Sequence, residues 1–270
     1  MKKTRYKIVL TIAGSDTIAG AGIQADLKTF SALGCYGLSV VTALTAQNTM
    51  GVASVHPVPF NFVRDQMDAV LSDIKPDAVK IGMLYSAAVI QTVAEQLEKY
   101  AVKNIVLDTV MASQRGECLM EEDAVRVLKD FLIPASAIIT PNLPEASVMV
   151  GRPVDNLQDM RNAALRLSTS GARAVLIKGG HLKGDDIKDL LYISSEDRFK
   201  VFESKRIATS NDHGTGCTLS SAIAAFLARG HGLEDSVGFA RRYLKGAILA
   251  GAGYEIGKGR GPLHHFYDLW

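Results

Sequence analysis

Short apolar runs alternate with longer amphipathic segments along most of the chain. Residues 8–12 are apolar and mostly β-branched, which predicts a buried strand, and the polar group Gly14-Ser-Asp follows soon after. In residues 23–33 apolar side chains recur every three or four positions, which predicts an amphipathic helix that ends at Gly34. The same strand–helix unit then recurs along the chain.

The repeated unit predicts an α/β fold. The predicted strands are residues 8–12, 38–44, 78–81, 105–107, 137–139 and 174–177, and the predicted helices are residues 23–33, 62–71, 87–100, 123–131, a short one near Glu145, 158–167, 215–229 and 233–252. We therefore expect a mostly parallel central sheet with helices on both faces. Residues 190–194 and 200–207 flank a polar turn and predict an antiparallel hairpin at one edge. No linker or internal repeat divides the chain, so we expect one domain over residues 1–270.

Composition and charge narrow the classes of partner. The chain is 47% hydrophobic and 21% charged, as in soluble globular proteins. A formal net charge of +2 gives no electrostatic reason to expect nucleic acid or an acidic membrane as partner. No apolar stretch approaches the roughly 18 residues that cross a bilayer. Cys35, Cys118 and Cys217 match neither a disulfide framework nor a metal site, so we expect a reducing compartment and a cytoplasmic protein.

Functional side chains follow most of the predicted strands. In an open α/β sheet, ligands bind beyond the carboxyl ends of the strands, where we expect Asp16, Gln47, Met83, Asp108, Asn142, Glu145 and Lys178. Each alone is also compatible with a loop or cap residue, and Asn142 and Glu145 have the spacing of a helix capping box. Together they supply the acids, amides and cation that phosphoryl transfer requires. The chain has neither the Gly-x-x-x-x-Gly-Lys-Ser/Thr phosphate loop nor a Gly-x-Gly-x-x-Gly fingerprint in register.

The segment Gly214-Thr215-Gly216 leads directly into an apolar, helix-forming segment. The first N–H groups of a helix have no partner inside it, and with the helix dipole they form a site for an anion such as a phosphate. Cys217 falls near the start of this helix, where a thiolate is stabilised. The alternative is that the glycines only allow a tight turn and that Cys217 is a small core residue.

Seven blocks in chain order carry a family resemblance, and a closing block is similar too. They are Gly14-Ser-Asp with Ala19-Gly-Ala-Gly-Ile-Gln-Ala-Asp-Leu-Lys-Thr-Phe30, Thr42-Ala-Leu-Thr-Ala-Gln-Asn-Thr49, Lys80-Ile-Gly-Met-Leu84, Leu107-Asp-Thr-Val-Met111, Ile139-Thr-Pro-Asn-Leu-Pro-Glu-Ala146, Lys178-Gly-Gly-His-Leu182, His213-Gly-Thr-Gly-Cys-Thr-Leu-Ser220 and the closing Gly257-Lys-Gly-Arg-Gly-Pro-Leu-His-His265. The chain resembles the hydroxymethylpyrimidine (phosphate) kinases of thiamine biosynthesis, in the ribokinase superfamily. The resemblance implies a ribokinase-like three-layer α/β/α sandwich that uses ATP and Mg²⁺.

The resemblance also implies roles for individual residues. Gln47 would bind the aminopyrimidine, because its amide pairs with an exocyclic amine and the adjacent ring nitrogen. The same pocket would be lined by Gly14, Met83 and Val110, and Asp16 would either contact substrate or brace its own loop.

The remaining roles concern the phosphates. Asn142 and Glu145 would organise Mg²⁺ and phosphates, and Lys178 would lie near the nucleotide. Gly214, Thr215 and Gly216 would form the anion hole. Cys217 takes the position of the aspartate base of ribokinase-type sugar kinases, and we hypothesise that its thiolate accepts the hydroxyl proton.

The function that the resemblance implies is ATP-dependent phosphorylation of 4-amino-5-hydroxymethyl-2-methylpyrimidine and of its monophosphate. The alternative is a pyridoxal, pyridoxine or pyridoxamine kinase. A further alternative is a non-catalytic binder with Cys217 as a thiol trap, against which the phosphate-binding set argues. We expect a homodimer. The chain departs from its relatives at Thr17-Ile18-Ala19-Gly20, where they usually carry a Ser-Gly-Gly type sequence, and this leaves the exact substrate open.

Overall fold

A computed structural model describes residues 4–112, 119–121 and 123–270 of the chain. Within these residues one nine-stranded sheet has the order β3-β2-β1-β4-β5-β6-β7-β8-β9. The strands are β1 (Ile8–Ser15), β2 (Tyr36–Asn48), β3 (Gly51–Pro57), β4 (Ala78–Ile81), β5 (Ile105–Leu107), β6 (Ile138–Ile139), β7 (Ala174–Ile177), β8 (Asp186–Ile193) and β9 (Arg198–Lys205). The six strands from β2 to β7 in this order are parallel, whereas β3, β8 and β9 pair antiparallel.

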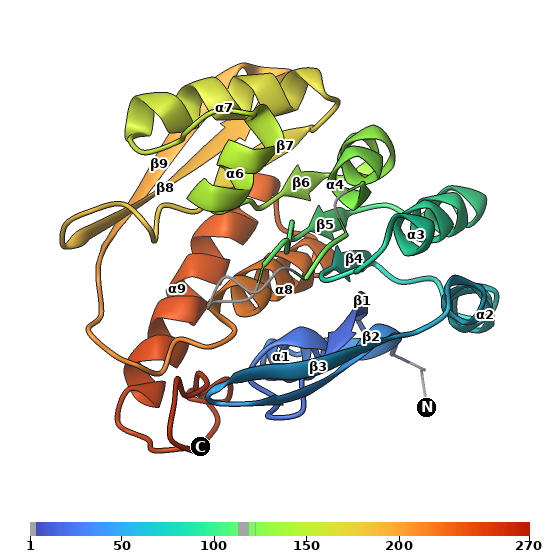
Figure 1. Cartoon of the computed structure of the whole chain (residues 1–270), viewed down its shortest axis with the longest axis horizontal. Coiled ribbons are helices and arrows are strands. Elements are labelled where there is room, and N and C mark those ends of the chain that lie inside the picture. The colour runs from blue at the N-terminus through green and yellow to red at the C-terminus, as the bar shows by residue number, and fades with distance from the viewer. Residues whose placement is uncertain (1–3, 113–118, 122) are drawn as a thin grey trace.

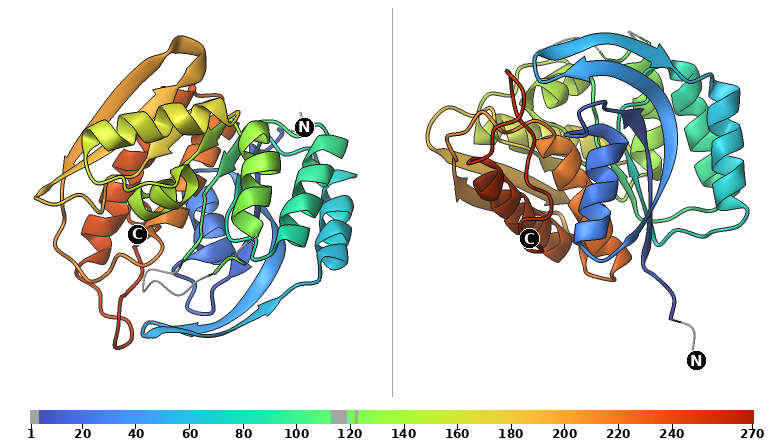
Figure 2. Two further views of the ribbon diagram at one scale, coloured as in Figure 1. Left: turned by 45° about the horizontal axis from the view of Figure 1, so that its top comes forward. Right: turned by 90° about the horizontal axis from the view of Figure 1, so that it is seen from below.

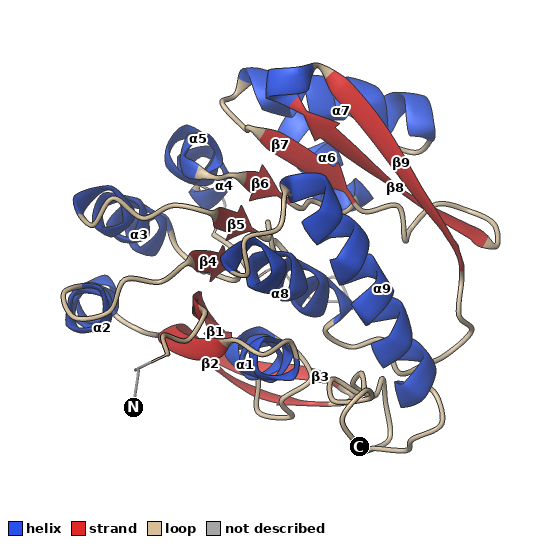
Figure 3. Cartoon of the chain, turned by 180° about the vertical axis from the view of Figure 1, so that it is seen from behind, coloured by secondary structure: helices blue, strands red, loops and turns tan. Residues whose placement is uncertain are grey.

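Helices cover both faces of this sheet (Figures 1 and 3). One face carries α1 (Gly22–Ala32), α8 (Thr215–Ala228) and α9 (Leu233–Gly251), whose buried side chains share one core cluster. The opposite face carries α2 (Phe60–Leu71), α3 (Ala87–Lys99), α4 (Ala124–Val127), α6 (Leu143–Val150) and α7 (Leu157–Thr169), which pack in the second cluster. The three-layer α/β/α sandwich is therefore confirmed.

Alternation along the parallel strands produces these two cores. In β1, Val9 packs with α1 and α8, whereas Leu10 and Ile12 pack with the helices of the opposite face. Successive side chains of a strand point to opposite faces, so a strand covered on both sides is apolar throughout. This is why continuous apolar runs marked the central strands in the sequence.

The β2–β3 ribbon was missed by the sequence analysis. β2 was expected to end at Leu44 but continues to Asn48, and it pairs antiparallel with β3 (Gly51–Pro57) as a curved ribbon (Figure 2). The outer part of the ribbon is largely exposed, so it has no apolar run that predicts a strand. The extension carries Gln47, and the ribbon therefore sets the position of a predicted site residue.

The remaining predictions of elements differ from the structure in detail. The β8–β9 hairpin at the other edge is confirmed, and both strands begin earlier than expected. The helix expected at residues 123–131 begins as α4 and passes through a π-helical turn, η1 (Leu128–Leu132), into α5 (Ile133–Ala135), while β8 and β9 are joined by a 3₁₀ turn, η2 (Ser194–Glu196). No helix among the described residues is long and apolar enough to cross a membrane.

Candidate active site

The carboxyl ends of the parallel strands open into a cleft of about 1130 Å³. Every candidate site residue named in the sequence analysis lines it: Gly14, Asp16, Gln47, Met83, Val110, Asn142, Glu145, Lys178, Gly214, Thr215, Gly216 and Cys217. These residues come from segments up to about 200 positions apart in the chain. The sheet topology brings them together, as the rule for open α/β sheets predicts.

The loop before α8 has a backbone conformation that requires glycine. Gly214 is the N-cap residue with φ of 87° and ψ of 11°, and a Cβ there would lie 1.8 Å from the carbonyl oxygen of Gly20. No side chain caps the first turn of α8. The N–H of Thr215 donates to the carbonyl oxygen of Asp212 at 3.3 Å, whereas the N–H groups of Gly216 and Cys217 have no partner among the described residues and are available to an anion in the cleft.

A buried carboxylate and a lysine lie beside this turn. Lys178 Nζ is 2.8 Å from Asp108 Oδ1, and a Cβ on Gly216 would lie 3.5 Å from the same Nζ. Asp108 also accepts hydrogen bonds from Thr140 Oγ1 at 3.1 Å and from Ser220 Oγ at 3.1 Å. Burial opposes the charge of Asp108, but Lys178, Lys80 and these hydrogen bonds hold its pKa below the ordinary value. Lys178 thus places a cation next to the anion-binding turn.

Asn142 and Glu145 form the capping box that their spacing predicted. Asn142 Oδ1 accepts from the backbone N–H of Glu145 at 2.8 Å, and Glu145 Oε2 accepts from the backbone N–H of Asn142 at 2.8 Å. Oε2 also accepts from Thr109 Oγ1 at 3.1 Å, whereas Oε1 accepts no hydrogen bond from the residues that the structure describes. Burial and the nearby Asp108 charge raise the pKa of Glu145 to about 7, although Lys178 opposes the rise.

The charged end of the cleft offers oxygen ligands for the Mg²⁺ that the resemblance implies. Mg²⁺ prefers carboxylate oxygens and keeps several of its waters in protein sites. Glu145 Oε1 and the charge of Asp108 fit a hydrated ion, whereas Asn142 Oδ1 is already used as the N-cap. Within the described part of the chain, no group of three or more His, Cys, Asp or Glu side chains is arranged as a metal site. The residues therefore fit a hydrated Mg²⁺ and not a dedicated protein cage.

At the other end of the cleft an apolar wall lies beside the polar side chains of Gln47, Asp16 and His213. Met83 packs with Ala43 and Leu119, and Val110 contacts this cluster. A Cβ on Gly14 would lie 2.7 Å from Met83 Cε, so only glycine leaves Met83 in place. Gln47 is half-buried and lines the cleft beside this surface. An apolar wall beside a small number of polar side chains suits a flat ring that carries a few polar groups.

Asp16 braces its loop, one of the two roles considered for it. Its Oδ2 accepts from the backbone N–H groups of Gly20 at 3.0 Å and Ala21 at 2.8 Å, and its Oδ1 accepts from Ile18 at 3.1 Å. Ala19 in this loop has φ of 59°, which a residue with a side chain rarely adopts. The carboxylate therefore holds a strained turn in place.

The environment of Cys217 differs from the expectation of a stabilised thiolate. Burial raises the pKa of this thiol to about 11, and the charges of Asp26 and Asp108 add to the rise, although Lys80 lowers it. The backbone N–H of Gly22 also lowers this pKa, but burial outweighs it. Cys217 is a neutral thiol at physiological pH in the ligand-free protein. Cys118 lies outside the described residues.

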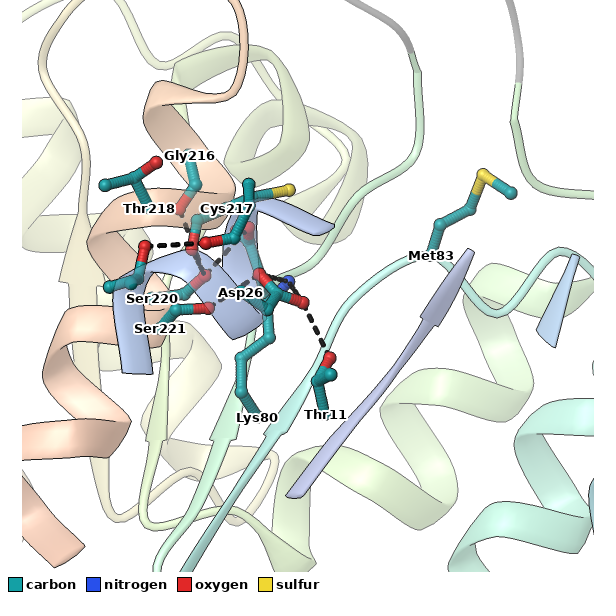
Figure 4. Close-up of polar contacts among 12 residues, drawn as sticks. Thr11, Asp26, Lys80, Met83, Gly216, Cys217, Thr218, Ser220 and Ser221 are labelled. Atoms are coloured by element: carbon teal, nitrogen blue, oxygen red, sulfur yellow. Dashed lines mark hydrogen bonds and ion pairs between the residues drawn. The ribbon is translucent and has the colours of Figure 1, made fainter. Parts of the chain in front are cut away.

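A buried ion pair beneath the anion-binding turn was missed by the sequence analysis (Figure 4). Lys80 Nζ lies 2.8 Å from both carboxylate oxygens of Asp26, and both side chains are fully buried. Asp26 also accepts from Thr11 Oγ1 at 2.6 Å and from Ser221 Oγ at 2.6 Å. The cluster joins β1, α1, β4 and α8. A lysine inside the otherwise apolar strand β4 is the signal that could have revealed it.

Comparisons with known proteins agree with this geometry. The chain matches the family model described as phosphomethylpyrimidine kinase over residues 16–264. It is 50% identical to a hydroxymethylpyrimidine/phosphomethylpyrimidine kinase of Rhizobium meliloti (strain 1021), with 97% of this chain and 98% of the relative covered.

Solved structures extend the comparison. The crystal structure of a phosphomethylpyrimidine kinase from Clostridium difficile 630 is similar with a TM-score of 0.80 and 44% identity, covering 89% of this chain and 99% of that one. A pyridoxal kinase from Staphylococcus aureus in complex with AMP-PCP and pyridoxal has a TM-score of 0.88 and 35% identity, and the match covers 98% of this chain and 95% of that chain. The chain is a kinase of the phosphotransferase class, and it belongs to the phosphomethylpyrimidine kinase family.

Proposed function

We propose that this protein transfers the γ-phosphate of ATP to the hydroxymethyl group of 4-amino-5-hydroxymethyl-2-methylpyrimidine, and then phosphorylates the monophosphate to the diphosphate. The observation that carries the proposal is the position of the α8 N-terminus in the cleft. It lies between the apolar end with Gln47 and the charged end with Lys178, Asp108 and Glu145. In phosphoryl transfer the phosphoryl group would move from the nucleotide at the charged end to the acceptor at the end with Gln47.

The backbone of the loop before α8 would supply most of the catalysis. The transition state of phosphoryl transfer spreads negative charge over the equatorial oxygens, so donors fixed in advance stabilise it. The unsatisfied N–H groups at Gly216 and Cys217 have this character, and Lys178 lies close to Gly216. Because Asp108 fixes Lys178 by an ion pair, the lysine needs little rearrangement when phosphate binds.

Glu145 would hold a hydrated Mg²⁺ at the charged end of the cleft, and the negative charge of the nearby Asp108 would add to the attraction. The ion, when bound, neutralises charge on the phosphates that flank the scissile bond. Asn142 would act by fixing the start of α6, since its Oδ1 caps that helix and so orients Glu145.

Cys217 would accept the proton of the substrate hydroxyl, as hypothesised from the sequence. Only the thiolate can accept a proton, and with a pKa of about 11 this form is a small minority at neutral pH. If Cys217 accepts the proton, the rate must therefore rise with pH as the thiolate fraction grows. The homodimer and the cytoplasmic location expected from the sequence stay predictions.

Vitamin B6 phosphorylation is the second candidate function. The similarity to a pyridoxal kinase in complex with pyridoxal favours it, because its ligand is also an aromatic ring with a hydroxymethyl group. Gln47 favours the aminopyrimidine, since an amide pairs with an amine and its neighbouring ring nitrogen.

The test is ATP turnover by the purified protein with each substrate in turn, with products identified by mass. The proposal expects kcat/KM for the aminopyrimidine to exceed that for pyridoxal by 2 or more orders of magnitude, on the order of what hydrogen-bond readout achieves. A preference for pyridoxal would replace the proposed function by the second candidate.

A further inference from the structure

His213 connects the side chains of Asp16 and Gln47 at the end of the cleft that carries Gln47. Its Nε2 lies 2.8 Å from Asp16 Oδ2 and 3.1 Å from the side-chain nitrogen of Gln47. The imidazole is largely buried, with 16% of its side chain exposed, and it packs against Gly20, where a Cβ would lie 2.4 Å from its Cδ2. One ring nitrogen therefore has two hydrogen-bonding neighbours at once, and the ring has little room to turn.

The hydrogen bonds of Asp16 determine which ring nitrogen of His213 carries a hydrogen. Asp16 accepts hydrogen bonds from three backbone N–H groups. Burial raises the pKa of this carboxyl group, but His213 and the backbone hydrogen bonds outweigh burial, so the pKa lies below the ordinary value. An ionised carboxylate only accepts hydrogen bonds. Nε2 of His213 must therefore carry a hydrogen, because its lone pair would otherwise face a carboxylate oxygen at 2.8 Å. This holds for the neutral Nε2–H tautomer and for the imidazolium alike.

The same hydrogen determines the orientation of the Gln47 amide. A donor at Nε2 of His213 needs an acceptor on Gln47, so the atom at 3.1 Å must be the amide oxygen and not the nitrogen. A rotation of 180° about the terminal bond exchanges the two atoms without changing the shape of the side chain.

Thr45 independently requires the same orientation. Its single hydroxyl hydrogen is donated to the carbonyl oxygen of Ser15 at 2.9 Å, so its Oγ1 can only accept from the Gln47 amide atom 3.4 Å away. That atom must then be the amide nitrogen. The Gln47 backbone is held as well, because Thr17 Oγ1 accepts from its N–H at 2.8 Å and its one hydroxyl hydrogen is shared between the carbonyl oxygens of Gln47 at 2.9 Å and Thr45 at 3.0 Å. Both neighbours of the amide thus select one of its two orientations.

We propose that His213 is a specificity-determining positioning residue, which holds the Gln47 amide oxygen toward itself and so fixes the order of acceptor and donor that Gln47 presents to the cleft. One lone pair of the Gln47 amide oxygen and one N–H of its amide nitrogen remain for the substrate. Their order matches an exocyclic amine next to a ring nitrogen, because the oxygen accepts from the amine and the N–H donates to the ring nitrogen. The inference rests on the proposed function and deepens it. If the amide could rotate freely, it would accommodate either order and would select less strongly for the amine.

The kinetic test compares two substrates that differ only in the amine, 4-amino-5-hydroxymethyl-2-methylpyrimidine and 5-hydroxymethyl-2-methylpyrimidine. In His213→Leu we expect the ratio of their kcat/KM values to fall by about tenfold or more, mainly through a higher KM for the amine substrate. His213→Gln restores a donor near the position of Nε2 and is expected to keep most of the wild-type ratio. An equal loss for both substrates in His213→Leu overturns the inference, because it shows that His213 only supports the loop.

A second measurement uses the wild-type protein and needs no turnover. Two-bond ¹⁵N–¹H spectra of the histidine rings report which ring nitrogen is protonated. We expect His213 to carry a hydrogen on Nε2, and protonation at Nδ1 alone contradicts the inference whatever the substrate is. If wild type has protonated Nε2 but does not phosphorylate the pyrimidine, the proposed function fails while the geometry of Gln47 stands.

Discussion

Single side chains in this cleft act through the groups beside them. Glu145 has a pKa near neutrality because burial and Asp108 oppose its charge. Cys217 is neutral because it is buried near two carboxylates. Neither property follows from the type of residue or from its position at a helix start. Both follow from neighbours that the fold brings from distant parts of the chain, and both give measurable dependences on pH.

The first prediction concerns Cys217 as proton acceptor. The active form is the thiolate, and the profile of kcat/KM reports groups of the free enzyme. With a pKa of about 11, the thiolate fraction grows by about tenfold per pH unit below that value, so kcat/KM is expected to rise with this slope between roughly pH 7 and 9. Cys217→Ser is expected to lower kcat by about 10²-fold or more and to remove the slope. A flat wild-type profile, or only a few-fold loss in Cys217→Ser, would show that the anion-binding loop carries the step without this thiol.

The second prediction concerns Glu145 and Mg²⁺. The deprotonated carboxylate binds the cation, so protons compete with Mg²⁺ at pH values below the pKa of about 7. Calorimetric titration of Mg²⁺ into the ligand-free protein is expected to show a dissociation constant that rises by about tenfold per unit as pH falls from 7 to 5. Glu145→Gln, which cannot ionise, is the matched control and is expected to bind weakly at every pH. Binding that is independent of pH in the wild type would remove Glu145 from the ion site.

At the scale of elements, the start of α8 depends on the segments packed against it. The Gly214 loop lies against Gly20, and the buried Lys80–Asp26 pair joins the first turns of α8 to β1, α1 and β4. Donors that must hold one geometry during phosphoryl transfer are thus supported by four elements. Changes to this support are expected to affect either stability or catalysis, depending on what they move.

The third prediction separates the effect of the loop shape at Gly214 from the strain that alanine causes at any residue with positive φ. Gly214 and Gly230 have similar φ values of 87° and 91°, so alanine is strained at both. Only at Gly214 does the added Cβ meet backbone, because nothing lies within 4 Å of a Cβ at Gly230. Gly214→Ala is expected to lower kcat by about 10²-fold or more, and Gly230→Ala is expected to lower only stability. Equal turnover by the two variants would mean that the loop geometry does not matter for the chemistry.

The fourth prediction concerns the buried pair. Lys80→Met leaves the Asp26 carboxylate buried with only hydroxyl partners, so the free energy of unfolding is expected to fall by about 3–5 kcal/mol in urea titrations. Lys80→Met combined with Asp26→Leu is expected to recover much of that loss. Lys205→Met is the control, since Lys205 makes an ion pair of the same 2.8 Å length on the surface, and it is expected to change stability little. Similar losses in both lysine variants would contradict the structural role of burial.

Apolar runs predicted the central elements well, and the reason is physical. Strands at Ala78–Ile81, Ile105–Leu107 and Ala174–Ile177 are buried on both faces, so their bounds follow from composition alone. β3 is exposed and pairs only with β2, and nothing in its composition requires a strand. The Lys80–Asp26 pair joins residues 54 positions apart, and the neighbours that set the pKa of Cys217 are also distant in sequence. Local patterns carry no information about such pairs, because tertiary packing creates them.

At the scale of the whole molecule, the cleft combines an acceptor end and a phosphate end on one sheet edge. The β2–β3 ribbon brings Gln47 to the first, β5 to β7 bring Asp108, Glu145 and Lys178 to the second, and α8 begins between them. The chain belongs to the phosphomethylpyrimidine kinase family, and its cleft has an apolar wall beside the Gln47 amide, which suits a small aminopyrimidine.

The most direct test is ATP-dependent turnover of the hydroxymethylpyrimidine and of pyridoxal, measured in parallel with Mg²⁺ and with products followed by mass. The account predicts a much larger kcat/KM for the pyrimidine, with monophosphate appearing first and diphosphate after it. Efficient phosphorylation of pyridoxal with little turnover of the pyrimidine would contradict it.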